Sequence, residues 1–474
     1  ELSAPSGFTI YYTLDGTDPR TSNTRQKYTG PISITNSESK GLGPITQSLG
    51  NYGSSKRLTG TVVRAYANRT VITTPVVTNT YFVANNLANK YNLPYVSISL
   101  RPADFNSRTN PRGIYVWPSV SNDQFDTKRR IIVFVEFYNE KGKKEDQLYA
   151  EMSLHGNGSM GATMKSFRMY FKNDLDKDSE HFPNKLTYDL FNGRAKDNNG
   201  KPIDSFKRII LRNSGNDYNR SMLRDALFQR LSEPLYCDYM ESQPVMVFIN
   251  GEFWGMYNAR ERYDDKYFKA HYGIQEENLV LLEAPTPLKY DMDFTRPYEI
   301  CEGVPGDEKP WEDLIRYCDT HNLANDAYYK VVTDQVDIYS LMDVYIVNMF
   351  FANRDWPGNN VKVWRNKNPK DPSGMDTKWR FVLLDTDMGA GFNDGPEYNM
   401  ITQHNVFNRG TGWILTKLMT SLLQNEGFKQ QFVERFIYVI DNVFSPDRTI
   451  PVLNNMANEI EKAMELNVAR WPQN

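Results

Sequence analysis

The sequence predicts a multidomain fold, with an immunoglobulin-like β-sandwich at the N-terminus and a larger, two-lobed α+β domain after it. Three observations predict this. The chain has 474 residues, which is long for one ordinary domain. Short alternating β patterns fill its beginning, and helical patterns dominate from Trp311 onward. We therefore expect a β-sandwich over 1–88, a first lobe over 89–265 and a mostly helical second lobe over 266–474.

The N-terminal segment reads as short strands separated by turns. Phe8, Ile10, Tyr12 and Leu14 alternate as a half-buried strand should, and Asp15-Gly16 is a turn signal. The stretches IYYTLDGTDP, YTGPI and VVRAYA resemble the chitobiase/β-hexosaminidase C-terminal-type domain, an immunoglobulin-like accessory module. That resemblance implies an accessory role, with a surface glycan as a possible partner and no catalysis.

A glycine-rich connection joins two strand patterns in the first lobe, within 148–172. Its glycines read G-x-G-x-x-G, but no helix follows, which argues against a dinucleotide site. A hairpin covering phosphates is one interpretation: Gly158 and Ser159 approach the phosphates, and Lys165 neutralises them. A plain β-hairpin with an exposed lysine is the other. Lys165 shares one face of the exiting strand with Phe167, Met169 and Phe171.

Two acidic residues could hold that lysine in place. Asp225 lies on an amphipathic helix predicted over 219–232. Glu261 follows a hairpin that turns at Asn250-Gly251. Both are also common solvated residues, so the sequence leaves the choice open.

The second lobe contains the strongest chemical signal. A helix predicted over 338–350 runs into NRDWPGNN, which offers Asp355 and Asn360, and a short apolar run then delivers Asp385 and Asp387. Phosphoryl transfer uses one carboxylate as proton acceptor, with an amide and a second carboxylate holding Mg²⁺. The Asp-x-x-x-x-Asn spacing equals that of the protein-kinase catalytic loop. The same residue types also build surface turns, helix caps and Ca²⁺ sites.

Composition excludes several classes of function. A net charge of -3 with no basic stripe argues against nucleic acid, and no apolar run is long enough for a membrane span. The five histidines and three cysteines (Cys237, Cys301 and Cys318) show no metal-ligand spacing. The chain begins at Glu1 without a signal peptide, so its start does not indicate a compartment.

With these pieces in order, the chain resembles the CotH family, the spore-coat protein H kinases, which have an atypical protein-kinase-like fold. The similar stretches are LPYVSISL, GIYV, SLHGNGS…KSFRMYF, VFINGEFWGMYNARE, NRDWPGNNVKVW and FVLLDTDMGAGF. The resemblance implies Lys165 on the nucleotide phosphates, Asp355 as catalytic base, and Asn360 with Asp385 as metal ligands. Asp387 is the alternative to Asp385.

The resemblance implies an ATP- and Mg²⁺- or Mn²⁺-dependent kinase acting on Ser or Thr of a protein substrate. It also suggests an extracytoplasmic or cell-surface location. The chain departs from the family after D-x-D, where Met388 to Phe392 replace a bulky aromatic-glycine pair, and in the turn-rich insertion 367–378. The alternative is a surface adhesion or carbohydrate-associated binding protein with a non-catalytic kinase-like domain. A glycoside hydrolase is weaker, since nothing identifies a nucleophile and acid pair.

Overall fold

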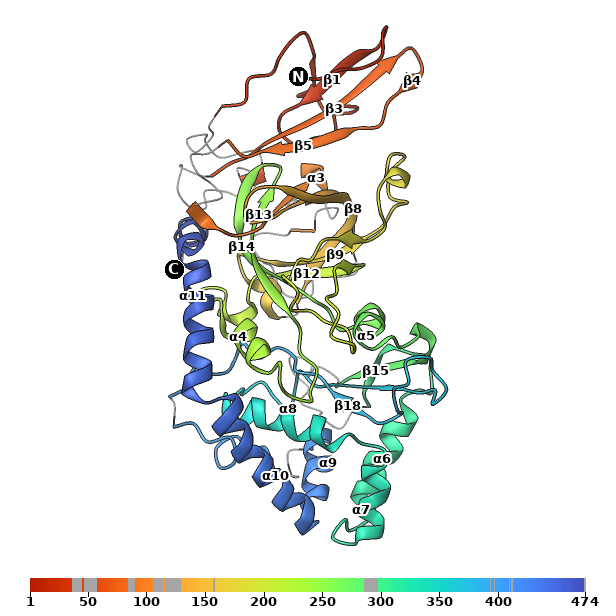
Figure 1. Ribbon diagram of the computed structural model, residues 1–474, viewed down its shortest axis with the longest axis vertical. Helices are drawn as coiled ribbons and strands as arrows, with labels where there is room; N and C mark the ends of the chain where they lie inside the picture. Colours follow the sequence, from red (N-terminus) through yellow and green to blue (C-terminus); the bar gives the residue numbers. More distant parts are fainter. Residues whose placement is uncertain are drawn as a thin grey trace.

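In the computed structural model, a β-sheet, a barrel and a helical part follow one another along the long axis (Figure 1). The structure describes residues 1–35, 45–46, 58–83, 90–105, 114–115, 129–156, 158–284, 297–392, 394–395, 397–408, 410 and 412–472. Two residues of the GIYV stretch, Gly113 and Val116, lie outside these ranges. No helix within the described ranges is both long and apolar enough to cross a membrane.

The N-terminal segment forms one antiparallel sheet in its described residues, in the order β2-β1-β3-β4, with β5 also paired to β3. Its strands are β1 (Thr9–Thr13), β2 (Gln26–Lys27), β3 (Thr61–Arg69), β4 (Ile72–Thr73) and β5 (Val77–Tyr81). The central strand β3 is buried from Thr61 to Ala67. A β-rich N-terminal domain is thus confirmed, while the second sheet of a sandwich stays a prediction.

Seven strands close the barrel in the order β12-β14-β13-β6-β7-β8-β9. They are β6 (Tyr95–Ser99), β7 (Ile131–Tyr138), β8 (Lys144–His155), β9 (Ser166–Phe171), β12 (Arg208–Arg212), β13 (Ser242–Ile249) and β14 (Glu252–Arg260). Neighbours are antiparallel except β13 and β6, which run parallel. The hairpin between β13 and β14 turns at Asn250-Gly251, as predicted, and both residues have positive φ.

Side chains alternate between the barrel interior and its outer face. Phe167, Met169, Ile209 and Leu211 are fully buried in the interior cluster of apolar side chains. The residues between them point outward, so Arg168 of β9 faces Ile210 of β12 in register, and Ile210 faces Arg260 of β14. The outer face of these three strands is therefore rich in arginine.

Short helices, strands and turns connect the longer elements of the chain. They are α3 (Pro102–Phe105), α4 (Arg224–Leu231), α5 (Asp265–Tyr272), β10 (Leu186–Thr187), β11 (Ser205–Phe206) and the 3-10 turns η2 (Gly158–Gly161), η3 (Ser179–His181), η4 (Gly215–Asp217) and η5 (Glu276–Asn278). Helix α4 begins later than predicted because Asp217 accepts the backbone N–H groups of Leu223 and Arg224, which caps the helix there.

A second sheet and most of the helices form the other part of the chain. The sheet order is β16-β15-β17-β18. Its strands are β15 (Leu279–Glu283), β16 (Glu299–Glu302), β17 (Lys362–Asn366) and β18 (Arg380–Phe381), and the helices are α6 (Lys309–Thr320), α7 (Asp326–Thr333), α8 (Ile338–Phe350), α9 (Ile414–Leu422), α10 (Glu426–Tyr438), the π-helical η7 (Val439–Val443) and α11 (Pro446–Arg470).

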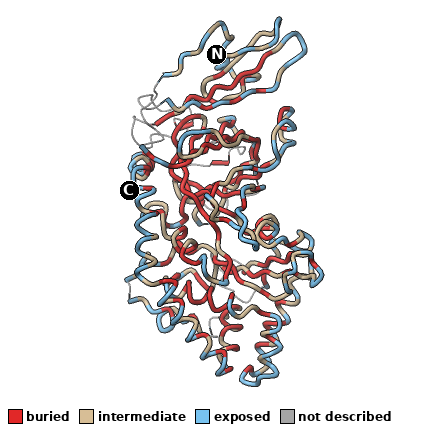
Figure 2. Tube along the Cα trace, in the orientation of Figure 1, coloured by how far each residue is buried: buried red, intermediate tan, exposed pale blue. Residues whose placement is uncertain are grey.

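Helix α8 lies at the centre of this helical part, and its bounds match the prediction. The Asp337 side chain caps it by accepting the N–H of Ser340 at 3.1 Å. Every residue from Ser340 to Asn348 is buried, and Figure 2 shows the buried segments running through the barrel and this region. The helix is therefore a rigid support for the loop that follows it.

Helix α11 crosses from the helical part to the barrel (Figure 1). Near its C-terminal end, Asn467 Oδ1 accepts the N–H of Met256 at 2.9 Å, and Trp471 Nε1 donates to the Trp254 carbonyl at 2.6 Å. Ile460 and Ala463 join the apolar cluster of the barrel. The helix therefore completes the barrel core from outside.

Ion pairs and hydrogen bonds attach the N-terminal sheet to the barrel. Arg20 pairs with Asp176 at 2.9 Å and with Asp178 at 3.2 Å. Buried Glu136 of β7 accepts from the backbone and hydroxyl of Thr80 on β5. The sheet is thus fixed on the barrel through charged contacts at two places.

Candidate functional site

A cavity of about 680 Å³ lies between the outer face of the barrel and the β15–β17 sheet. It collects polar side chains from segments far apart in the sequence. Its lining residues are His155, Gly156, Gly158, Ser159, Arg168, Ile210, Arg212, Asn216, Met240, Arg260, Arg262, Tyr263, Glu283, Cys301, Glu302, Asp355, Asn359, Asn360, Lys362, Leu384, Asp385, Asp387 and Met388. The size is typical of a pocket for a small organic ligand.

The loop after α8 delivers Asp355 to this cavity. Its buried Trp356 packs edge-to-face on Tyr345 of α8, with ring centroids 4.6 Å apart, which anchors the loop on the helix. Asp355 Oδ2 accepts hydrogen bonds from Asn359 Nδ2 at 3.1 Å and from Asn360 Nδ2 at 2.7 Å. The two amides therefore hold one carboxylate oxygen and fix its orientation.

The segment after β18 supplies two further carboxylates with different surroundings. The Asp385 side chain is 32% exposed and its residue adopts φ of +51°, a strained conformation that is uncommon outside glycine. Asp387 is buried and accepts from the backbone N–H of Asn216 at 2.9 Å and from Asn216 Nδ2 at 3.0 Å. A Cβ at Gly215 would overlap the Asp387 carboxylate, so this close approach requires glycine there.

Arg212 of β12 lies between these carboxylates. Its Nη2 contacts Asp385 and Asp387, the latter at 3.0 Å, and its Nε is 3.3 Å from Asp225 Oδ2. Burial disfavours the charged guanidinium, but the surrounding carboxylates outweigh it and raise the pKa of Arg212. Arg212 is thus a buried cation held by three acids.

The carboxylates repel one another despite this arginine. Burial, together with the charge of Asp385, raises the pKa of Asp355 to about 6. Burial and the same neighbour raise the pKa of Asp387 well above its usual value. Crowded negative charge of this kind would be relieved by an additional cation.

The oxygen donors fit a hard divalent metal ion. Asp385, Asp387 and Asn360 supply carboxylate and amide oxygens, the ligands that Mg²⁺ and Mn²⁺ prefer. Across the described ranges, no group of three or more His, Cys, Asp or Glu side chains forms a ready metal cage. The Arg212 guanidinium instead occupies the position of a cation shared by Asp385 and Asp387.

The opposite wall of the cavity is basic. Arg168 Nε donates to His155 Nδ1 at 2.9 Å, and no carboxylate in the described part of the chain is within ion-pair distance of it. Burial, with the charge of nearby Arg262, lowers the pKa of Arg168. Burial and Arg168 lower the pKa of His155 well below its usual value, consistent with a neutral imidazole that accepts this bond. An anion beside Arg168 would therefore be stabilised.

The structure brings together most of the residues predicted from sequence. Asp355, Asn360, Asp385 and Asp387 line the cavity together. Gly158 and Ser159 line its rim, as expected of the glycine-rich connection. All of them lie on turns or loops that the barrel and α8 position.

Lys165 differs from its expected position, because it does not line this cavity. Its side chain is buried, and Nζ donates to the carbonyls of Met160 at 2.5 Å and Ala162 at 3.1 Å, 5.3 Å from the Tyr115 ring centroid. Burial lowers the pKa of Lys165 to about 8. The physical reason is that side chains alternate between the two faces of a strand. Lys165 is on the same face as Phe167 and Met169, and that face lines the barrel interior.

The two acids expected to hold Lys165 have other partners. Asp225 of α4 pairs with Arg212 and Arg260, both of which line the cavity, and accepts from Thr386 N at 3.0 Å. Glu261 Oε1 is 2.7 Å from His271 Nε2 and lines a neighbouring pocket. Asp225 therefore orients cations of the site, while Glu261 lies outside the cavity.

Sequence reasoning missed the arginines of the outer barrel face. Arg168, Arg212 and Arg260 alternate with buried apolar residues in β9, β12 and β14. That alternation was the available signal, since an arginine next to a core-facing apolar residue on a strand lies on the opposite face.

Two family models match the chain. A family model described as "CotH kinase protein" matches residues 152–474, and one described as "Fn3 associated" matches residues 1–81. No curated protein matches the chain.

Proposed function

Because the chain belongs to the CotH kinase family, we propose that it is an ATP- and divalent-metal-dependent phosphotransferase acting on Ser or Thr hydroxyls of protein. The observation that carries the proposal is the meeting of Asp355, Asn360, Asp385 and Asp387 in one cavity whose opposite wall is basic. Kinase chemistry needs both the acidic and the basic part of this cavity. The acidic part would bind a metal ion and accept a proton, and the basic part would bind the phosphates. The expected kinase-like lobes correspond in this proposal to the barrel and the helical part.

Asp355 is the proposed catalytic base. Its carboxylate accepts the proton of the acceptor hydroxyl as that oxygen forms its bond to the γ-phosphorus and the bond to the ADP oxygen breaks. Asn359 and Asn360 hold its Oδ2, which leaves Oδ1 for the acceptor. Preorganisation of this kind lowers the barrier without contributing a covalent step.

Asp385 and Asn360, with Asp387 beside them, are the proposed metal ligands. A divalent ion bound there would supply positive charge to the phosphate oxygens. Arg168 on the basic wall and Arg212 beside the carboxylates take the phosphate-facing role that the family resemblance gave to Lys165, since both line the cavity. Asp225 positions Arg212 and Arg260 from α4.

The test is transfer of label from γ-labelled ATP, with Mg²⁺ or Mn²⁺, to the chain itself or to a generic protein acceptor. We expect label with the wild type and none with Asp385→Ala. Asp313→Ala is the matched control, because Asp313 is 66% exposed on α6 and distant from the cavity lining. Equal labelling by wild type and Asp385→Ala would refute the assignment. A location outside the cytoplasm belongs to the same proposal, and fractionation of the source cells tests it.

A second candidate is a surface adhesion or carbohydrate-associated binding protein that transfers no phosphate. The observation that favours it is the Arg212 guanidinium lying between Asp385 and Asp387, where a metal would bind. Thermal stabilisation by oligosaccharides, without stabilisation by ATP and metal, would select this candidate.

A further inference from the structure

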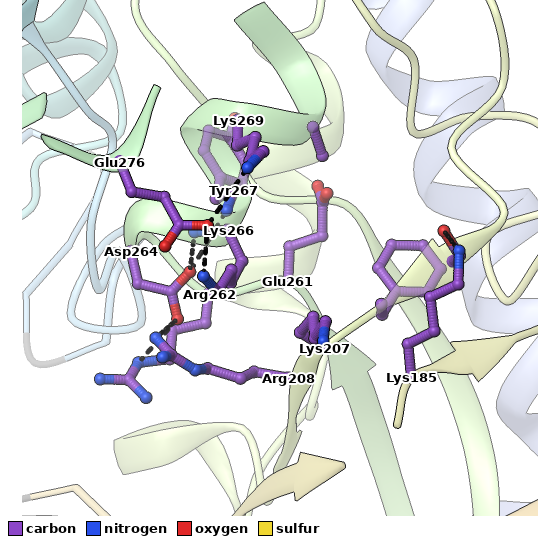
Figure 3. A pocket seen from close by; sticks show the side chains of 13 residues that line it. Lys185, Lys207, Arg208, Glu261, Arg262, Asp264, Lys266, Tyr267, Lys269 and Glu276 are labelled. Atoms are coloured by element: carbon purple, nitrogen blue, oxygen red, sulfur yellow. Dashed lines mark hydrogen bonds and ion pairs between the residues drawn. The ribbon is translucent and has the colours of Figure 1, made fainter. Parts of the chain in front are cut away.

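A second cavity, of about 370 Å³, lies beside the candidate active site (Figure 3). Its walls come from Lys185 just before β10, from β11 and the first residue of β12, from the segment 261–264, from helix α5 and from Glu276. Six of its lining residues are cationic: Lys185, Lys207, Arg208, Arg262, Lys266 and Lys269. Only three are acidic, so the pocket carries an excess of positive charge.

The three acidic residues already have partners. Asp264 caps α5 by accepting the N–H groups of Lys266 and Tyr267, and it pairs with Arg208 at 2.8 Å. Glu276 pairs with Lys266 at 2.5 Å and with Lys269 at 3.4 Å. The third, Glu261, binds His271 outside the pocket lining. None of these acids is left to neutralise the rest of the pocket.

Two lysines supply the uncompensated charge. Lys185 Nζ is 3.4 Å from the Ser205 hydroxyl, and neither Lys185 nor Lys207 has an ion pair to any carboxylate that the structure describes. Both are exposed. Figure 3 shows Lys185 on the opposite side of the pocket from Glu276, with Lys207 between them. A ligand entering from solvent therefore meets two free ammonium groups.

The pocket adjoins the candidate active site, because the two cavities share a lining residue. Arg262 lines both cavities. Arg208 lines the second cavity and Arg212 the first, and both lie on the outer face of β12, four residues apart. At about 3.3 Å per strand residue, the backbones of Arg208 and Arg212 are separated by about 13 Å.

We propose that this pocket binds an anionic side chain that flanks, in the protein acceptor, the Ser or Thr that receives the phosphoryl group. The inference rests on the proposed function, since it names the substrate that the same site would take. An extended acceptor with its hydroxyl at Asp355 would carry its flanking residues along the outer barrel face. Exposed lysines are flexible point charges, so they select an acidic side chain without fixing its exact geometry.

The experiment compares neutral serine peptides in which a single Glu is moved one position at a time, each paired with a Gln peptide. Initial rates with ATP and Mg²⁺ give KM and kcat for the wild type, for Lys185→Ala/Lys207→Ala and for Lys462→Ala. Lys462 is exposed on α11 and lines neither cavity, so it is the matched control. A phosphoserine series identifies which anion is preferred. Fluorescence anisotropy of the labelled peptides measures binding without requiring transfer.

We expect Glu at one position to lower KM about tenfold relative to Gln while kcat stays within about twofold, as an ion-pairing contact outside the chemistry should. The double variant loses this preference, and Lys462→Ala keeps it. A stronger effect of phosphoserine would support the same pocket with a phosphorylated acceptor as its ligand. A Glu preference retained by the double variant, or none at any position, would overturn the inference.

Failure of the proposed function gives a different result. In that case no peptide and no part of the chain receives label, and ATP with metal causes no thermal shift. The anisotropy measurement then tests the pocket independently of phosphoryl transfer. Tighter, salt-sensitive binding of the Glu peptide, lost in the double variant, would support the inference. Equal binding of the Glu and Gln peptides would overturn it.

Discussion

Asp225→Asn should destabilise the protein strongly, because it removes the charge that two buried arginines share. The Asp225 side chain is 4% exposed, and its Oδ2 contacts Arg260 and lies 3.3 Å from Arg212 Nε. Its Oδ1 accepts from Thr386 N and Thr386 Oγ1. Asparagine keeps the shape and can keep the bonds to Thr386 through Oδ1, but its Nδ2 then faces the arginines, so they lose both the charge and its acceptor oxygen.

The magnitude follows from which partners remain. Removing one member of a buried ion pair costs about 3–5 kcal/mol, because the other charge is left uncompensated. Arg212 keeps Asp385 and Asp387, whereas the described residues offer Arg260 no second carboxylate within ion-pair distance. We therefore expect a loss near the lower limit, about 3 kcal/mol.

Urea denaturation followed by tryptophan fluorescence measures this loss. Asp313→Asn is the control, since that exposed pair with Arg316 should contribute less than about 1 kcal/mol. A loss below about 1 kcal/mol for Asp225→Asn would refute the reasoning.

The pH dependence has a definite sign. Burial alone would raise the pKa of Asp225, but Arg260 and Arg212 outweigh it and hold the pKa below the ordinary value of 3.8. The charged form therefore stabilises the fold above about pH 4, and this contribution is lost as the pH falls through the lower folded-state pKa. The difference between wild type and Asp225→Asn should stay constant from about pH 5 to 8 and shrink in acid.

Three other perturbations test the remaining assignments. Asp355→Ala should abolish phosphoryl transfer while the melting temperature stays within a few degrees of wild type, because Asp355 lies on a polar loop; a retained rate would contradict its role as base. Arg168→Met should raise KM for ATP about tenfold, whereas Lys165→Met should lower thermal stability and leave KM unchanged, because only Arg168 lines the cavity. A raised KM for ATP in Lys165→Met, with an unchanged KM in Arg168→Met, would assign phosphate binding to Lys165 instead. Arg20→Ala should make limited proteolysis between the N-terminal sheet and the barrel faster, since Arg20 pairs across that boundary; unchanged cleavage would show that other contacts hold the sheet.

The sequence predicted elements whose boundaries depend on local chemistry. Helix α8 was predicted with correct bounds because its apolar spacing is regular, and the structure adds the Asp337 cap at its start. The acidic loops were found for a similar reason: Asp355, Asn360, Asp385 and Asp387 stand next to clear apolar runs. Residues of this kind carry their signal within a few neighbours.

The sequence did not show which face of each strand points into the barrel and which points towards the cavity. The alternation in β9 correctly grouped Lys165 with Phe167 and Met169, but alternation does not state which face lines a cavity. The place of Arg212 among Asp225, Asp385 and Asp387 joins three parts of the chain, β12, α4 and the segment after β18. The closure of the barrel determines both the inward face of β9 and the neighbours of Arg212. Closure depends on contacts between residues far apart in the sequence.

The docking of α11 on the barrel also determines when, during synthesis of the chain, the barrel can be completed. Trp254 and Met256 of β14 contact Asn467 and Trp471, more than two hundred residues later in the chain. During synthesis, this part of the barrel wall must wait, uncovered, until the ribosome has released residues near 470. The nascent barrel therefore exposes an apolar surface during the synthesis of the residues between β14 and Asn467, and a chaperone that shields β14 would be most useful in that interval.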